Sequence, residues 1–155
     1  MECKKHWRIL LVCLIIVYAV AFIGGLFTTN AVKSDWYQTI KPSITPPNWV
    51  FPVVWNVLFL LIAISMCFSW ASKKQNQKTS IIVSYWINLM LNILWSVFYF
   101  GFKSPLHALV IAVLMLVSII HLIILNWKIN KKASYLLIPY LLWIGFAIIL
   151  NYLSI

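Results

Sequence analysis

Large aromatic and amide side chains recur at helical spacing in three apolar stretches of the chain. Positions three, four and seven residues apart share a helix face, so the members of each set lie together. The three sets are Phe51, Trp55, Phe59 and Ile62; Asn88, Asn92, Trp95 and Tyr99; and Trp143, Phe146, Ala147, Leu150 and Asn151. Large apolar walls with a few polar groups are typical of a ligand pocket. The spacing equally allows helix–helix packing in which the amides bond between helices.

Side chains that could transfer protons or bind a metal are scarce. The acidic residues are Glu2 and Asp35, and both lie outside the apolar stretches. No carboxylate pair is therefore available for acid–base catalysis, and a proton-driven carboxylate pump is not expected. The three cysteines, Cys3, Cys13 and Cys67, have no CxxC spacing. Their odd number predicts neither a metal site nor a disulfide framework, and Cys13 and Cys67 are expected to be small packing residues.

The histidines do not predict a haem site. His107 and His121 are 14 residues apart in one apolar stretch. That spacing corresponds to about 21 Å along a helix, so the two side chains cannot ligate one iron. His6 precedes the first apolar stretch. We expect polar contacts, not metal ligation, from these side chains.

The composition is that of an integral membrane protein. Of 155 residues, 64% are hydrophobic and 9% are charged, whereas a soluble domain has about 25% charged residues. A globule of this size could not hide so much apolar surface from water. This excludes a soluble domain, a disordered chain and a secreted disulfide scaffold. The net charge of +10 comes from short basic runs between apolar stretches, a pattern of membrane-flanking segments and not of a nucleic-acid surface.

Five uncharged stretches predict a single all-α domain over residues 1–155, an integral membrane bundle of five transmembrane helices. Each is near or above the length of about 20 residues that a membrane-spanning helix needs. They cover residues 9–28, 48–72, 79–102, 104–127 and 133–155. The first runs too far to be a cleaved signal sequence, so a retained helix is expected. Pro52 and Pro139 fall inside two stretches and are expected to bend their helices. Trp7, Trp70 and Trp127 lie at stretch ends, as interfacial tryptophans do.

The basic residues predict the orientation in a cell membrane. One side has nine of them, in the N-terminus and in the second and fourth loops; the other has Lys33, Lys41 and Lys103. By the positive-inside rule the side with nine is cytoplasmic. The N-terminus is then inside the cell, and the first loop and the C-terminus are outside.

The first loop, from Thr29 to Pro47, is long and rich in proline and aromatic residues. It contains Trp36-Tyr37, Lys41-Pro42 and Thr45-Pro46-Pro47. Each proline biases the preceding residue toward an extended shape, so a stiff loop folded over one end of the bundle is expected. The alternative is that Trp36 and Tyr37 only anchor the loop at the headgroups.

Three segments together resemble the TspO/MBR family, the bacterial tryptophan-rich sensory proteins and the mitochondrial translocator protein. The first is the loop just described with its continuation Asn48-Trp49-Val50-Phe51-Pro52 and Trp55. The second is NLMLNILWSVFYF, from Asn88 to Phe100, and the third is LLIPYLLWIGFAIILNYL, from Leu136 to Leu153. The resemblance covers nearly the whole chain after Trp36.

The resemblance implies a five-helix bundle with a ligand cavity capped by the first loop. It also implies binding of porphyrins, such as protoporphyrin IX and haem, and of isoquinoline or benzodiazepine-type ligands. The porphyrin is then a ligand, and no cofactor is required. By position, the implied binding residues are Trp36, Tyr37, Trp49, Phe51, Trp55, Asn88, Asn92, Trp95, Trp143, Phe146, Ala147 and Leu150.

Several functions remain open within this resemblance. The chain could be a porphyrin sensor or transporter, a regulator that contacts another membrane protein, or an enzyme for light-dependent oxidative degradation of protoporphyrin IX. The resemblance also implies a homodimer, for which spans three and four offer mainly Leu, Ile and aromatic side chains. No basic residue follows Tyr152, so the cholesterol-recognition pattern of the animal members is incomplete and sterol transport is not carried over.

The predicted orientation can be tested by cysteine labelling of intact cells. Single cysteines are placed at Ser34 and Gln75 in a background in which Cys3, Cys13 and Cys67 are replaced. A membrane-impermeant reagent is expected to label position 34 and to spare position 75, because the first loop is predicted to be outside. Labelling at 75 with protection at 34 would reverse the orientation.

Overall fold

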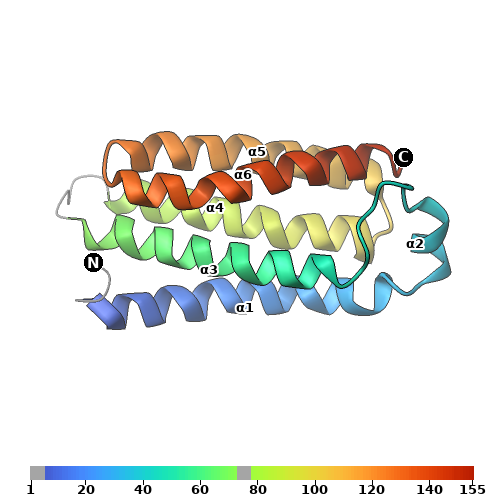
Figure 1. Ribbon diagram of the computed structural model, residues 1–155, viewed down its shortest axis with the longest axis horizontal. Helices are drawn as coiled ribbons and strands as arrows, with labels where there is room; N and C mark the ends of the chain where they lie inside the picture. The colour runs from blue at the N-terminus through green and yellow to red at the C-terminus, as the bar shows by residue number, and fades with distance from the viewer. Residues whose placement is uncertain (1–5, 73–77) are drawn as a thin grey trace.

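The computed structural model describes residues 6–72 and 78–155, and this part of the chain is all-helical (Figure 1). Five of its helical segments are long and apolar enough to cross a membrane. The elements are α1 (Trp7–Ala31), α2 (Asp35–Ile40), α3 (Val50–Ala71), α4 (Lys78–Ser96), the π-helical segment η3 (Val97–Gly101), α5 (Pro105–Trp127) and α6 (Lys131–Tyr152). The five predicted spans are thus confirmed, with ends that differ by a few residues.

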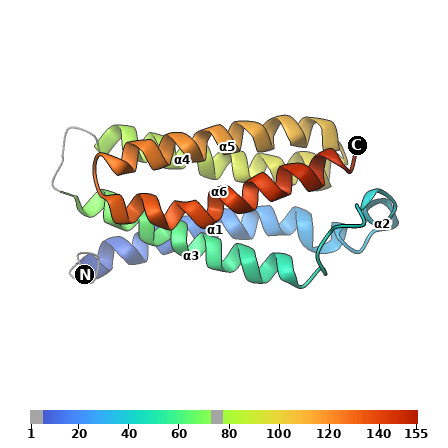
Figure 2. The same cartoon turned by 45° about the horizontal axis from the view of Figure 1, so that its top comes forward.

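The long helices lie side by side in a closed ring. In order around the ring, α1 packs on α3, α3 on α6, α6 on α5, α5 on α4, and α4 again on α1, while α3 and α4 touch only slightly across it. The start of α1 and the C-terminus lie at opposite ends of the bundle (Figures 1 and 2). We call the end that carries α2 and the C-terminus the lid end, and the opposite end the basic end.

The basic end owes its name to five described cations. Arg8, Lys78, Lys128, Lys131 and Lys132 lie at the first or last turns of the helices that meet there. Lys33, Lys41 and Lys103 lie in the connections at the lid end. Lys4, Lys5, Lys73 and Lys74, which also enter the predicted charge asymmetry, lie outside the described residues.

The first loop contains a short helix that its proline-rich sequence does not suggest. The Ser34 side chain caps α2 by accepting a hydrogen bond from the Tyr37 backbone N–H at 3.3 Å, which satisfies a donor that the first turn leaves free. Asp35 in the same turn is favourable beside the positive helix N-terminus. The helix ends at Ile40, because the next residue, Lys41, precedes Pro42 and has extended backbone geometry.

A layer of buried hydroxyl and amide groups joins four helices near the basic end. Tyr85 of α4 is 1% exposed, and its hydroxyl lies 2.7 Å from Ser65 Oγ and 3.3 Å from Ser69 Oγ of α3. Asn126 of α5 donates to the same hydroxyl at 3.1 Å. Ser65 donates onward to the Ala133 carbonyl of α6 at 2.7 Å. Because polar groups in lipid must be paired inside the protein, this layer fixes the four helices against one another.

The sequence predicts that the third span is a regular helix to its end. The structure instead changes to π geometry at Val97–Gly101. A π turn contains an additional residue, and such turns are frequent at functional sites. Tyr99 and Phe100 are consecutive here, and both are buried. Gly101 lies against Phe27 of α1, whose ring would be 3.2 Å from a Cβ at this position.

Two expectations about single residues are corrected. Pro52 lies in the first turn of α3, where no intrahelical hydrogen bond is lost, so it does not interrupt the helix; Pro139 does lie inside α6.

Cys13 is a free thiol in the core, as expected. Cys67 is also in the core but is disulfide-bonded, which the odd number of cysteines did not suggest. Cys3 lies outside the described residues.

The close approach of α1 to α4 predicts a large difference between two neighbouring glycines. A Cβ at Gly24 would lie 3.3 Å from Ser96 Oγ, whereas a Cβ at Gly25 would meet nothing within 4 Å. Gly24→Leu is therefore expected to destabilise the fold by about 1–3 kcal/mol, the usual effect of overpacking. Gly25→Leu should leave the thermal unfolding midpoint in detergent unchanged. Equal midpoints for the two variants would show that α1 does not pack on α4 in this way.

Candidate functional site

The lid helix α2 presents two neighbouring aromatic rings to the π segment. The ring of Trp36 is 6.0 Å from that of Tyr99, measured between centroids. Tyr37 lies 6.5 Å from Tyr99 and 5.7 Å from Phe100. Tyr37 is only 6% exposed, so the predicted folding of the loop over one end of the bundle is confirmed, and Tyr37 is not merely an interfacial anchor.

Burial has an electrostatic consequence for the lid. Removal from water, followed by the proximity of Tyr99, raises the pKa of Tyr37 to about 12. A tyrosine is already neutral at physiological pH, so the raised pKa only extends to more alkaline solution the range in which no charge opposes lid packing.

Trp95 connects the lid to the remaining helices. Its ring stacks on Tyr99 at 5.1 Å, and its indole N–H donates to Asn151 Oδ1 of α6 at 2.9 Å. Asn151 in turn donates to the Pro105 carbonyl of α5 at 2.8 Å, and the Tyr99 hydroxyl donates to Ser154 Oγ at 2.9 Å. These bonds hold the aromatic floor beneath the lid in place.

The two predicted amides meet at Tyr140 in the middle of the bundle. Asn92 donates to the Tyr140 hydroxyl at 3.2 Å, and that hydroxyl donates to Asn88 Oδ1 at 3.1 Å. Asn88 donates to Ser118 Oγ at 2.7 Å. Both amides are thus buried in bonds between α4, α5 and α6, which is the packing role that the sequence left open. A ligand that bonds to Asn92 has to compete with Tyr140.

A second group of aromatic rings lines the contact between α3 and α6. Trp55 stacks on Phe59 at 5.2 Å and meets the Tyr140 ring edge-on at 6.2 Å. Phe51 lies 5.8 Å from Trp143, which lies 5.7 Å from Phe146. Beside these rings is a groove of about 570 Å³, lined by Val53, Val54, Val57, Leu58, Pro139, Leu142, Trp143 and Phe146.

The twelve residues named from the resemblance therefore fall into separate groups. Trp36, Tyr37 and Trp95 meet under the lid, and Trp95 also packs against the main core, as do Trp55 and Trp143. Leu150 is buried on α6, and Ala147 is half-buried there. Trp49, the N-cap of α3, is 68% exposed and is not brought to the other rings.

Tyr140 is the residue of this region that the sequence analysis did not single out. It contacts Trp55 and bonds to both amides. A signal was present, because Tyr140, Ile144, Ala147 and Asn151 follow one another at helical spacing on α6. Trp143 meets Phe51 of α3, whereas Tyr140, Ile144 and Asn151 are buried in the bundle.

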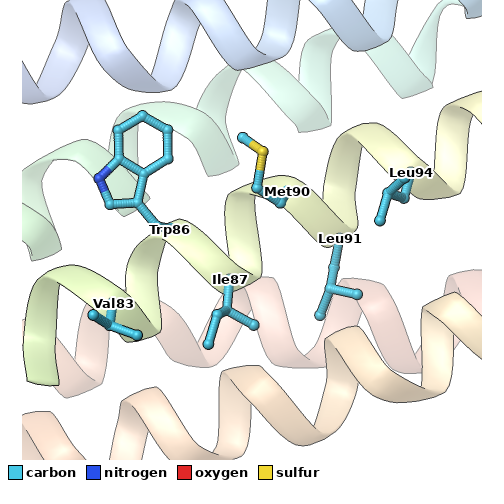
Figure 3. Close-up of a pocket in the computed structure, with 6 residues that line it drawn as sticks. All are labelled: Val83, Trp86, Ile87, Met90, Leu91 and Leu94. Atoms are coloured by element: carbon cyan, nitrogen blue, oxygen red, sulfur yellow. The ribbon is translucent and has the colours of Figure 1, made fainter.

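A second groove, of about 370 Å³, follows the outer face of α4 (Figure 3). It is lined by Val83, Trp86, Ile87, Met90, Leu91 and Leu94. In Figure 3, Val83, Ile87 and Leu91 form one row along the helix, and Trp86 and Met90 lie on its other side. None of the candidate site residues described above is among those that line this groove.

Of the two histidines of α5, His107 adjoins the lid cluster through Phe98, whereas His121 lies further along the helix. His107 is exposed at the start of α5, where its Nδ1 lies 2.7 Å from Ser104 Oγ and its ring stacks on Phe98 at 6.0 Å. These are the polar contacts that were expected of it. His121 is exposed on α5, 14 residues further along the helix.

The described site consists of neutral rings, hydroxyls and amides. Such a lining suits a flat apolar ligand with polar atoms at its edge, because aromatic faces contribute stacking area and amides bond to the edge. Tetrapyrroles and fused aromatic rings have this shape.

Comparison with known proteins agrees with the resemblance. The sequence profile of the TspO/MBR family matches residues 12–154. The chain is 38% identical to the tryptophan-rich protein TspO of Chlorobaculum tepidum, over 96% of this chain and 95% of that protein. It is 37% identical to the protein of the same name from Archaeoglobus fulgidus, over 92% of each. The human translocator protein is 29% identical, over 84% of this chain and 79% of that protein.

The central position of Tyr140 predicts a stability effect of its hydroxyl. Tyr140→Phe keeps the ring against Trp55 but removes the bonds to Asn88 and Asn92, so buried amide groups lose their partner. The cost is expected to be about 1–3 kcal/mol, seen as a lower unfolding midpoint. Tyr152→Phe, at a tyrosine that is 67% exposed, is the matched control and should change nothing. A Tyr140→Phe protein as stable as the control would contradict the bonding pattern.

Proposed function

Because the chain belongs to the TspO/MBR family, we propose that its aromatic residues at the lid end bind a porphyrin. The family and its named members make the chain a multi-pass membrane protein of the sensor and receptor type. Protoporphyrin IX and haem are the proposed ligands, and isoquinoline and benzodiazepine-type molecules are proposed to occupy the same site. The porphyrin is ligand and not cofactor.

The observation that carries this proposal is the position of Trp95. It packs in the lid cluster with Trp36 and Tyr37, and it packs against the core that also borders Trp55 and Trp143. Trp95 therefore places the lid rings against the same core that the rings of the α3–α6 contact adjoin. The groove volume of about 570 Å³ lies in the usual range of about 300–1,000 Å³ for ligand sites.

Ligand entry follows from the contacts that close the site. The rings of the lid now lie against Tyr99 and Phe100, so a flat ligand has to take their place on the aromatic floor. The lid is tied to the bundle through these rings, while the Lys41 ammonium lies 3.3 Å from Asn48 Oδ1 within the loop itself. Exchange of ring–ring for ring–ligand contacts therefore costs little. Asn92 can donate a hydrogen bond to the ligand once its bond to the Tyr140 hydroxyl is broken.

A second candidate function is the light-dependent oxidative degradation of protoporphyrin IX. The stacked pair Trp95 and Tyr99, at 5.1 Å, puts oxidisable rings beside the proposed site. Incubation of the purified protein with protoporphyrin IX in light and in darkness, with identification of the products, separates the two functions. Binding alone returns the porphyrin unchanged, and degradation gives new products in light only.

The proposed location is the cell membrane, with the basic end in the cytoplasm and the lid outside. The support is the number of cations at the two ends, which follows the positive-inside rule. A porphyrin then reaches the lid from the outer side or from the bilayer.

We also propose a homodimer that uses the outer groove of α4. The groove is lined by Trp, Met, Leu, Ile and Val side chains, and packing between such faces is one of the forces that join helices in lipid. A mass measurement in nanodiscs is expected to give dimers, and Trp86→Ala is expected to shift them toward monomers. Monomer alone at every protein-to-lipid ratio would contradict the proposal.

The ligand site predicts which tryptophans affect porphyrin affinity. Trp55→Leu and Trp143→Leu each remove one ring contact, worth about 0.5–1.5 kcal/mol beyond burial. Each should therefore weaken protoporphyrin IX binding about 2- to 12-fold, measured by quenching of the remaining tryptophan fluorescence.

Trp127→Leu, at the basic end, is the control and is expected to leave porphyrin affinity unchanged. If this variant is folded and binds as weakly as the other two, the ligand does not lie at the lid end.

A further inference from the structure

Three tryptophans at the basic end each have a cation over the ring. The Arg8 guanidinium is 5.6 Å from the centre of Trp7, the Lys78 ammonium is 5.4 Å from Trp70, and Lys131 is 5.5 Å from Trp127. Such contacts hold a charged group beside an apolar ring at the depth where helix ends meet lipid headgroups. The first two pairs adjoin segments outside the described residues, whereas the third is described completely.

The third pair belongs to a compact surface at the turn between α5 and α6, which we call the α5–α6 corner and define as Trp127, Lys131, Lys132 and Tyr135. Trp127 and Tyr135 meet edge to face at 5.3 Å, and they remain 45% and 55% exposed. Both lysines are exposed. Asn130 fixes the turn by accepting a hydrogen bond from the Lys132 backbone at 3.0 Å.

The charge at this corner has no acidic counterpart in the described part of the basic end. The described acidic residue is Asp35, which lies in α2 at the lid end. The sequence places Glu2 on the basic side against nine basic residues. The corner thus presents two exposed lysines beside two half-exposed rings, which suits a partner with both negative charge and apolar surface.

We propose that the α5–α6 corner binds the headgroup of an anionic phospholipid. The two lysines pair with its phosphate, and the half-exposed rings of Trp127 and Tyr135 pack on its glycerol and upper acyl region. The positive-inside rule needs only positive charges to orient the protein in the membrane. The α5–α6 corner combines such charges with an ordered pair of rings, which orientation alone does not require. A small soluble anion would leave the rings unused, so a lipid fits the whole corner.

The test is native mass spectrometry of the detergent-purified full chain. Phosphatidylglycerol and phosphatidylcholine with identical acyl chains are added separately, and retained lipid is counted. Phosphatidylglycerol is expected to bind more tightly. K131Q/K132Q should weaken its binding about fivefold for each lysine removed, while K131R/K132R should retain it. K33Q/K41Q, at the lid end, is the matched control and should bind like the unchanged protein.

Trp127→Leu tests the role of the ring at constant charge and should also lower phosphatidylglycerol retention, without affecting porphyrin affinity. Three results would overturn the proposal. They are equal retention of the two lipids, an equal loss in K33Q/K41Q and K131Q/K132Q, and full displacement of phosphatidylglycerol by millimolar inorganic phosphate. The last result would identify a phosphate site that does not recognise lipid. Thermal unfolding shows that each variant compared is folded.

Discussion

Pairing of polar groups inside an apolar bundle is the constraint on which the rest of this structure depends. Within the bilayer no water is available to satisfy a hydroxyl or an amide, so each has to find its partner inside the protein, on its own helix or on a neighbouring one. The third span provides such groups at three levels, with Tyr85 near the basic end, Asn92 in the middle and Trp95 near the lid. Their partners on α5 and α6 set the relative depth and rotation of these helices. Apolar packing alone would not do so, because lipid tails compete with it.

The same constraint determines what is left for a ligand. The amides are occupied by Tyr140 and by Ser118, and the Trp95 indole N–H is occupied by Asn151. The ring faces are the part of the site that can exchange partners at low cost, because one aromatic contact replaces another. A receptor for flat molecules can therefore be built without charged groups. Its selectivity then rests on ring geometry under the lid and on whether a ligand can replace Tyr140 at Asn92.

The sequence was sufficient to predict the five transmembrane helices, because uncharged apolar stretches of this length form few other structures. Helical spacing also identified the faces of α4 and α6 that carry Asn92, Trp95 and Trp143. It could not show which neighbour each face meets. The roles of Tyr140 and Asn151 depend on the order of helices in the ring. The spacing of residues along one helix carries no information about that order. The π segment and the exposure of Trp49 likewise arise from packing between elements. Ser34 followed by Asp35 is a capping signal for α2, which the sequence analysis did not use.

The central claim is that flat ligands bind among the rings at the lid end. The most direct measurement is fluorine NMR of the protein labelled with 5-fluorotryptophan and titrated with protoporphyrin IX, with resonances assigned by single substitutions. The account predicts that Trp36, Trp55, Trp95 and Trp143 shift, while Trp7, Trp70 and Trp127 at the basic end stay in place. Shifts at Trp7, Trp70 and Trp127 with the other four unchanged would contradict it.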